Sequence, residues 1–204
     1  ILFHGAKNII SGDISISKLE GLNDFGKGFY CGENIEQSIM FVSGYHGSSL
    51  YIIKFDHSEL KSAVYHVDKD WMLAIAFFRG KIDSYQNHTE VRKALNRMHG
   101  ADYVIAPIAD NRMFEIIDSF IDGEITDVQC QHCLSATDLG NQYVLLSEKA
   151  ASFAKVVRHC YLSEKEKEYY LSARREANKI SNDKVKAARR QYRGQGLYIE
   201  DILK

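Results

Sequence analysis

Short apolar runs alternate with amphipathic segments along most of the chain. Runs rich in β-branched and aromatic residues predict strands at residues 1–3, 49–55, 102–107 and 141–147. Apolar residues at helical spacing predict helices at residues 33–46, 68–79, 111–122, 126–135 and 147–153. Because few strands and helices follow one another at the spacing of βαβ units, we expect an α+β fold rather than a doubly wound parallel sheet.

The pattern changes at residue 163. Ser163 and Glu166 have the spacing of a capping box, and the residues that follow include almost no helix breakers. The apolar stripe of this segment is thin, which predicts one long or broken helix that is partly exposed to solvent. We therefore expect a domain over residues 1–160 and a basic helical extension over residues 161–204.

The charge of the chain is divided between these two parts. The net charge of the 204 residues is −1, but residues 1–157 hold 14 basic and 20 acidic residues, whereas residues 158–193 hold 11 basic and 5 acidic residues. Such a positive segment can contact nucleic acid, an acidic partner or the acidic body of its own chain. The sequence leaves these three explanations open.

Composition excludes several classes of protein. The 45% content of hydrophobic residues excludes a disordered chain. No apolar run approaches the roughly 18 residues of a transmembrane helix, so we expect no membrane partner. The first residues show no basic region followed by an apolar stretch, the mark of a secretory signal. We therefore expect a cytoplasmic protein.

Three short polar motifs lie at the edges of predicted strands. His4 and Gly5 follow the first apolar triplet, a glycine-rich segment covers residues 24–30, and Gln142 lies at the start of the last clear strand. Each motif is weak by itself, because such a histidine is usually structural and a glycine-rich loop is usually a turn. Their order along the chain is more informative, because it matches a known superfamily.

Five blocks of sequence carry this match. In chain order they are Leu2-Phe3-His4-Gly5, Asp24-Phe25-Gly26-Lys27-Gly28-Phe29-Tyr30, Trp71 with Arg79, Asp102 to Arg112, and Asn141-Gln142-Tyr143 leading into Ser147. They resemble the ADP-ribosyltransferases of the His-Tyr-Glu type, and more closely an uncharacterised bacterial domain family of that superfamily, related to toxin and phage-defence enzymes. The resemblance covers residues 1–155, and the basic segment lies outside it.

The resemblance implies an ADP-ribosyltransferase fold, a split antiparallel β-sandwich with flanking helices and NAD in the cleft. It implies an enzyme that transfers ADP-ribose from NAD to a macromolecule through an oxocarbenium-like state, as in glycoside cleavage. The implied catalytic residues are Gln142, Tyr30 and His4. The residues implied to bind NAD are His4, Gly5, Gly26, Lys27, Gly28, Phe29, Tyr30 and Arg79.

The chemistry of these side chains suits such roles. A ring nitrogen of His4 can bond a ribose hydroxyl, and the missing Cβ of Gly5 lets the backbone approach nicotinamide closely. The ring of Tyr30 can stack on nicotinamide. Lys27 or Arg79 can contact a phosphate, although an aspartate partner is equally expected for Arg79.

Gln142 departs from the commonest pattern of the superfamily, which has a glutamate at this position. An amide can still bond a ribose hydroxyl, but it carries no full charge and cannot act as a general base. The alternative function is therefore a catalytically inactive module that binds NAD or a partner.

A cluster of cations near the end of the chain bears on the acceptor of ADP-ribose. It consists of Lys184, Lys186, Arg189, Arg190 and Arg193. Because cations neutralise phosphates, the cluster and the resemblance together favour RNA or single-stranded DNA over protein as the acceptor. The same helix can instead dock an antitoxin in a partner's groove.

Cys130 and Cys133 suggest a different chemistry. One CxxC motif with His132 between its cysteines can donate to zinc, and His159 with Cys160 can complete four ligands. A second CxxC motif is missing from the sequence. Reduced thiols on a helix are therefore the simpler explanation, and we expect no metal site.

Overall fold

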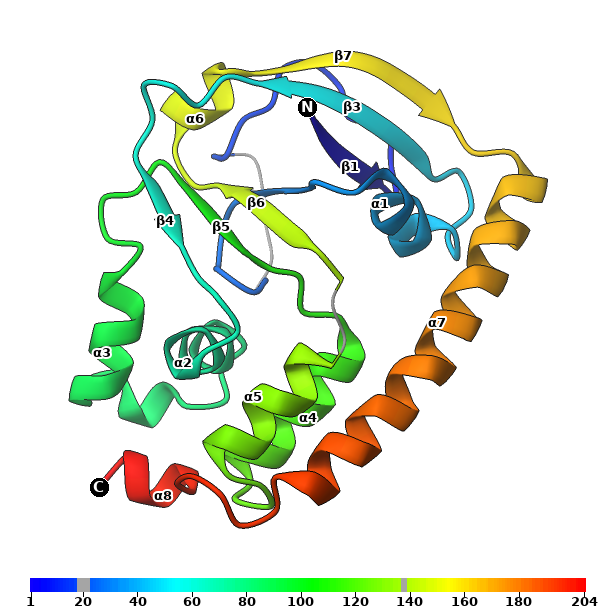
Figure 1. The fold of residues 1–204 in the computed structure, drawn as a ribbon. Helices are drawn as coiled ribbons and strands as arrows, with labels where there is room; N and C mark the ends of the chain where they lie inside the picture. The colour runs from blue at the N-terminus through cyan, green and yellow to red at the C-terminus, as the bar shows by residue number, and fades with distance from the viewer. Residues whose placement is uncertain (18–22, 137–138) are drawn as a thin grey trace.

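A mixed β-sheet forms the centre of the protein (Figure 1). The computed structural model describes residues 1–17, 23–136 and 139–204. Within them the sheet has seven strands in the order β4-β5-β6-β2-β1-β3-β7. The strands are β1 (Leu2–Ala6), β2 (Phe29–Gly32), β3 (Ser49–Phe55), β4 (Ser62–Val64), β5 (Tyr103–Pro107), β6 (Asn141–Leu145) and β7 (Ala154–Tyr161). The expected α+β class is confirmed, but β4 and β5 are parallel, so the sheet is mixed rather than wholly antiparallel.

Helices surround this sheet unevenly. They are α1 (Ile35–Val42), α2 (Lys69–Phe78), α3 (Thr89–Asn96), α4 (Asn111–Ile121), α5 (Asp127–Ser135), α6 (Glu148–Ser152), α7 (Glu164–Gln191) and α8 (Ile199–Ile202). In Figure 1, α2 to α5 and α8 gather below the sheet, whereas α1 and α6 lie beside its upper part. None of the described helices is long and apolar enough to cross a membrane.

Side-chain caps fix where several helices begin. The carboxylate of Asp68 accepts a hydrogen bond from the backbone N–H of Trp71, which starts α2 at the predicted place. Ser163 and Glu166 form the predicted capping box at the start of α7, and Thr126 forms another with Gln129 at the start of α5. These starts are local in origin, because each cap and its partner lie three residues apart.

The sheet is weakest between β1 and β2. These strands share one registered pair, Phe3 with Gly32, whereas β1 and β3 pair from Leu2–Ile53 to Ala6–Ser49. The sheet is therefore continuous but consists of two wings, β4-β5-β6-β2 and β1-β3-β7, that are joined at its centre by this short contact. The candidate residues described below lie on the strands at this junction.

Two hydrophobic cores lie on opposite faces of the sheet. Side chains alternate along each strand, so Val144 of β6 enters the first core and its neighbour Leu145 enters the second. The first core packs the sheet against α2, α4 and α5, and the second packs it against α6 and residues 10–16. Each residue of interest can therefore be assigned to one face.

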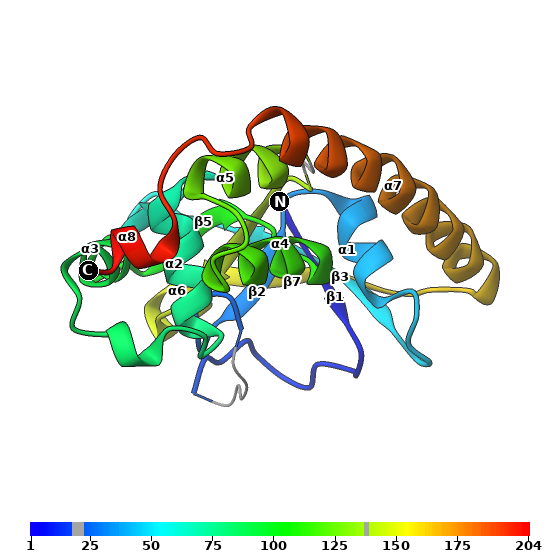
Figure 2. The same ribbon diagram turned by 90° about the horizontal axis from the view of Figure 1, so that it is seen from below.

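The C-terminal segment is part of the same folded body. α7 is one unbroken helix of 28 residues, about 42 Å long, and it contacts both α1 and α5. Figure 2 shows it on the side opposite the segment that joins β1 to β2. The residues Ile199, Ile202 and Leu203 enter the first core, so the end of the chain is anchored beneath the sheet.

Candidate functional site

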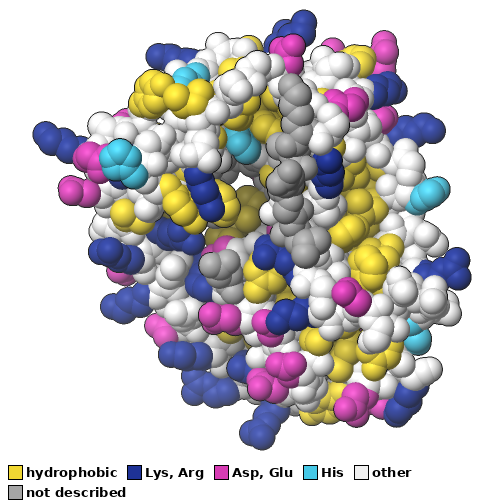
Figure 3. All heavy atoms as spheres, turned by 180° about the vertical axis from the view of Figure 1, so that it is seen from behind, with side chains coloured by type: hydrophobic (Ala, Val, Ile, Leu, Met, Phe, Trp, Pro, Cys, Tyr) yellow, Lys and Arg dark blue, Asp and Glu magenta, His cyan; other side chains and the backbone are white. Residues whose placement is uncertain are grey.

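Three of the predicted residues lie on adjacent strands at the centre of the sheet. His4 is on β1, Tyr30 is on β2, and Gln142 is on β6 opposite Gly32. The strand order β6-β2-β1 therefore collects motifs that are up to 138 positions apart. Figure 3 shows a hollow on the face that carries the segment between β1 and β2, with hydrophobic atoms at its floor and cationic and histidine side chains around it.

His4 is held in one tautomer. Its Nδ1 atom lies 2.6 Å from the carbonyl oxygen of Tyr30, so Nδ1 carries the proton and donates it to this oxygen. Burial lowers the pKa of His4 below its usual value, and the bond to the Tyr30 carbonyl only partly offsets this effect. The ring is therefore neutral at pH 7, and its Nε2 lone pair can accept a hydrogen bond.

The hydroxyl group of Tyr30 fastens the glycine-rich loop. It accepts a hydrogen bond from the backbone N–H of Phe25 at 3.0 Å and donates one to the carbonyl of Gly26 at 2.8 Å. Burial is the main reason that the pKa of Tyr30 is raised, so the hydroxyl stays protonated. Both bonding positions are used inside the loop, which leaves the ring as the part of Tyr30 that can meet a ligand.

Gln142 belongs to a buried polar network built around Asp24. The Gln142 Nε2 group donates to Oδ2 of Asp24 at 3.0 Å and to the carbonyl of Pro107 at 3.1 Å. Arg79 donates to the other oxygen of Asp24 through Nε at 3.2 Å and Nη2 at 2.6 Å. Asp24 and Gln142 are each only 6% exposed. The network therefore fixes both side chains.

This network determines the orientation of the Gln142 amide. Asp24 and the Pro107 carbonyl both require a donor, so Nε2 must face them and Oε1 must face away. Gln142 consequently presents an oxygen acceptor, as a glutamate would. The carboxylate of Asp24 also polarises the amide through their hydrogen bond, which increases the negative charge on Oε1.

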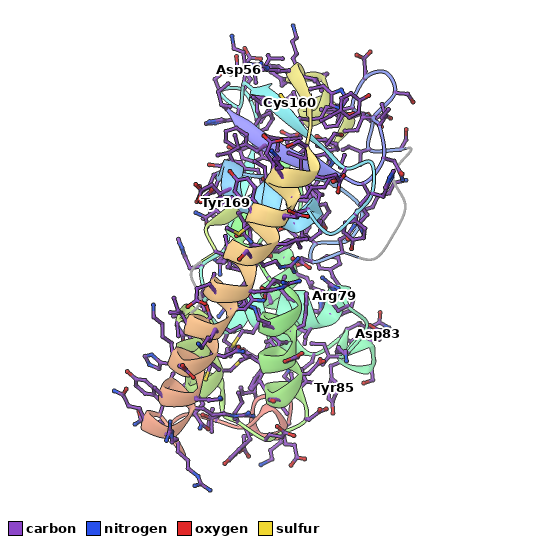
Figure 4. All side chains as sticks on the ribbon, turned by 90° about the vertical axis from the view of Figure 1, so that its right-hand side faces the viewer. Asp56, Arg79, Asp83, Tyr85, Cys160 and Tyr169 are labelled. Carbon is purple, nitrogen blue, oxygen red and sulfur yellow. The ribbon has the colours of Figure 1, made fainter. Side chains whose placement is uncertain are left out.

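Arg79 is paired with aspartate, which was one of its two predicted environments. Its guanidinium group also stacks on the ring of Phe114, 3.7 Å from the ring centroid. Figure 4 shows Arg79 beside α4, the helix that carries Phe114. Asp24 and Phe114 had no assigned role in the sequence analysis. The only sequence signal for Asp24 is its position in the glycine-rich block, next to the aromatic residue Phe25.

The glycines of the predicted NAD site have packing roles in this structure. A Cβ at Gly5 would collide with the carbonyl of Ser38 in α1, and a Cβ at Gly28 would lie 2.6 Å from a methyl group of Val144. Gly26 has φ +72°, a conformation that favours glycine. These positions let α1 and β6 approach the site closely.

Lys27 and Phe29 make contacts within the protein itself. The Lys27 ammonium group is exposed and donates to the carbonyl of Ser17 at 2.8 Å, so it fastens the loop. Phe29 is buried in the second core, where its ring stacks on His4 with a centroid separation of 4.4 Å. Tyr30 packs against the first core. His4 therefore lies toward the face of the second core, whereas Tyr30 and Gln142 lie toward the face of the first core.

The predicted basic cluster lies away from this junction. Lys184, Lys186, Arg189 and Arg190 are exposed on α7, and Arg193 is exposed just after it. Four of these five residues line one open cavity, and Lys184 does not. The cluster is therefore a separate surface of the molecule.

The CxxC cysteines have a structural explanation. The Cys130 thiol donates to the carbonyl of Ile116 at 3.8 Å, and the Cys133 thiol donates to the carbonyl of Val185 at 3.7 Å. Burial raises the pKa of both thiols, which keeps them protonated. His159 and Cys160 lie on β7, and the described part of the chain brings together no group of three or more residues able to hold a metal. The thiols therefore join α5 to α4 and α7.

Comparison with known proteins identifies one family. No curated protein matches the chain. No solved structure matches it either. The model of a family described as proteins of unknown function, DUF3990, matches residues 1–156, a segment that includes His4, Tyr30 and Gln142. Because this match covers well over half of the 204 residues, the chain belongs to the DUF3990 family.

Proposed function

We propose that the protein is an NAD-dependent ADP-ribosyltransferase, a glycosyltransferase that moves ADP-ribose from NAD to a macromolecule. The observation that carries the proposal is the fixed orientation of the buried Gln142 side chain, whose Nε2 donates to Asp24 and Pro107 and whose Oε1 accepts no hydrogen bond from the described residues. An acceptor oxygen at this place suits a ribose hydroxyl group. On this proposal the two wings of the sheet correspond to the split sandwich of the ADP-ribosyltransferase fold.

His4 supports the same assignment from the neighbouring wing. Its neutral ring offers Nε2 as a second hydrogen-bond acceptor. NAD carries ribose hydroxyl groups that donate to such acceptors, and it supplies the ADP-ribosyl group. On this proposal Nε2 of His4 and Oε1 of Gln142 each accept a hydrogen bond from a ribose hydroxyl group of NAD.

Gln142 and Tyr30 have complementary roles in this proposal. Charge that develops on the ribose is stabilised by a polarised oxygen in a site with little water. Gln142 provides that oxygen, and the negative charge behind it is that of Asp24. The fastened ring of Tyr30 offers an aromatic surface for nicotinamide.

The biological setting remains part of the proposal. A toxin or phage-defence effector in the cytoplasm, with an antitoxin that covers α7, agrees with the resemblance described above. RNA or single-stranded DNA is the favoured acceptor, because the exposed cations of α7 suit phosphates. Protein acceptors are the competing class.

Incubation with labelled NAD and a cell lysate tests the activity. After the reaction, the lysate is divided by nuclease and protease treatment, and we expect the label in the nucleic-acid fraction. Gln142→Ala should lose the label when it is assayed well below its own melting temperature, and the exposed Lys165→Gln serves as a surface control that should keep the label. Absence of label from every fraction, with NAD intact, refutes the proposal.

A second function follows from the missing carboxylate at position 142. If the amide does not support turnover, the protein binds NAD without cleaving it. NAD would then raise the melting temperature in proportion to the logarithm of its concentration, with no nicotinamide released. Release of nicotinamide by the wild-type protein, lost in Gln142→Ala, would rule out this function.

A further inference from the structure

The cations at the C-terminal end of α7 are largely uncompensated. The sequence allowed them to pair with the acidic body of the protein, but only Arg189 makes such a pair among the described residues, with Glu124 at 3.1 Å. Lys186 lies 4.0 Å from Asp183 on its own helix. Arg190 and Arg193 form no ion pair within residues 1–17, 23–136 and 139–204. Their charge is therefore available to a ligand.

Four of these cations converge on one cavity. It has a volume of about 610 Å³, opens to solvent, and lies between the end of α7, the start of α5 and the segment before α8. Lys186, Arg189, Arg190 and Arg193 line it together with a single acidic residue, Glu124. A concave surface with four cations and one acid attracts anions strongly, because its low-dielectric walls concentrate the field.

The walls of this cavity are held in place by contacts between α5 and α7. Gln129 Nε2 donates to the carbonyl of Arg189 at 2.7 Å. The rings of His132 and Tyr192 stack with an interplanar angle of 4°. A ligand therefore meets cations whose backbone positions are already fixed, which reduces the entropic cost of binding. In Figure 4, α7 lies along the surface of the molecule.

We infer that this cavity binds the phosphate backbone of a single-stranded nucleic acid. Lys186 lies one helical turn from Arg189 and Arg190, so these charges are about 5–6 Å apart at their Cβ atoms, and Arg193 in the turn after α7 lines the same cavity. Such an arrangement of cations suits a nucleic acid strand, which carries one negative charge per nucleotide. As an acceptor site, the cavity rests on the proposed transferase function, but binding itself does not require NAD.

An exposed aromatic ring explains the choice of a single strand over a duplex. Tyr198 lines the same cavity and is 42% exposed. Unpaired bases stack on such a ring, whereas the bases of a duplex are already stacked on one another. The cavity thus combines phosphate contacts with one stacking surface.

Fluorescence anisotropy without NAD tests the inference. The probes are labelled oligouridine RNA, oligothymidine DNA of equal length, a DNA duplex and a glutamate-rich peptide of equal charge. We expect both single strands to bind more tightly than the duplex and the peptide. Arg190→Gln with Arg193→Gln should weaken single-strand binding about tenfold or more, and should reduce the dependence of log K on log salt by about two.

A matched double variant separates the cavity from net charge. Arg175→Gln with Lys179→Gln also removes two exposed cations from α7, but neither residue lines the cavity. We expect this variant to lose less than about threefold in affinity. Tyr198→Ala should weaken binding to the single strands several-fold, and Tyr198→Phe should restore it.

The inference is overturned if the two double variants weaken binding equally, because net charge alone would then explain it. Equal or tighter binding of the glutamate-rich peptide would assign the cavity to an acidic protein partner, and equal binding of the duplex would remove the stacking argument. A protein that binds single strands but leaves NAD intact would refute the proposed transferase while keeping this site.

Discussion

A carboxylate in place of Gln142 provides a direct test of the Asp24 network. Gln142→Glu restores the residue type that is commonest in the resembling superfamily, yet we expect it to destabilise this protein. In the wild-type structure Nε2 of Gln142 donates to Asp24 at 3.0 Å. The substitution places a second carboxylate against Asp24 in a site that is 6% exposed. Two like charges then face each other with little water between them.

The magnitude follows from two estimates. Unit charges 4 Å apart repel by about 4 kcal/mol at the effective dielectric constant of a protein. The variant can escape this cost by protonating the new carboxyl group, which then donates to Asp24 as the amide did. Protonation costs about 1.36 kcal/mol per pH unit above the usual value of about 4.3, which is about 5 kcal/mol at pH 8 and about 1 kcal/mol at pH 5. We therefore expect a loss of about 4 kcal/mol at pH 8 and about 1 kcal/mol at pH 5.

The direction of this pH dependence follows from the difference in proton binding between the folded and unfolded states. The new carboxyl group has a pKa in the folded state above its pKa in the unfolded state, so the folded variant binds more protons above about pH 4.3. Its stability relative to the wild type therefore falls as the pH rises. Gln142→Met, which removes both hydrogen bonds without adding charge, should instead show a loss that does not change with pH.

A charge exchange completes the test. In the double variant Gln142→Glu with Asp24→Asn, the new amide at position 24 can accept from Arg79 and donate to the new carboxylate. The loss should then be smaller than the sum of the single losses by about 2 kcal/mol or more. The rescue is partial, because the Pro107 carbonyl loses its donor.

Urea denaturation followed by tryptophan fluorescence measures these values. The protein has one tryptophan, Trp71, which is 0% exposed and reports on unfolding of the first core. A loss below about 1 kcal/mol for Gln142→Glu at pH 8, with no coupling to Asp24→Asn, would contradict the reasoning. It would mean that Gln142 and Asp24 do not touch in solution.

Three further predictions concern the same site. Tyr30→Phe should lower the free energy of unfolding by about 1–2 kcal/mol in urea, because the loop loses two hydrogen bonds; an unchanged midpoint would contradict this. Wild-type stability should fall as the pH drops below about 6.5, since the unfolded state protonates His4 before the folded state does. His4→Gln should flatten that part of the profile, and an identical slope would count against the neutral ring. Gly28→Ala should cost about 1–3 kcal/mol because its new methyl group meets Val144, whereas Gly44→Ala, whose nearest atom is 4.0 Å away, should cost much less; thermal melting compares the two.

Helices and strands could largely be predicted from the sequence where residues close together in the chain determine them. The caps at Asp68, Thr126 and Ser163 lie three residues from their partners, so the sequence shows them directly. β4, β7 and the helix α3 were not predicted. β4 has three residues, too few for a periodic pattern, and β7 follows α6 with no turn residue between them. Its pairing with β3 decides its conformation, and that partner is about 100 positions away in the sequence.

Long-range order decided the candidate site. The sequence selected His4, Tyr30 and Gln142 by their order, but it could not show that Asp24 joins Arg79 and Gln142. These residues are 55 and 118 positions from Asp24. Hydrogen bonds between such distant groups depend on the sheet order and on the approach of α2, neither of which has a local signal.

For the charge of the chain, too, one part could be determined from the sequence and another only from the tertiary structure. The sequence by itself determined that the positive charge is concentrated in residues 158–193, because composition along the chain is fixed covalently. Only the tertiary structure decided that Arg190 and Arg193 form no ion pair with the acidic body within the described residues, and that both line one cavity with Lys186 and Arg189. The physical reason is that a cation forms part of a binding surface only together with the residues near it in space. The packing of α7 on α5 determines which residues these are.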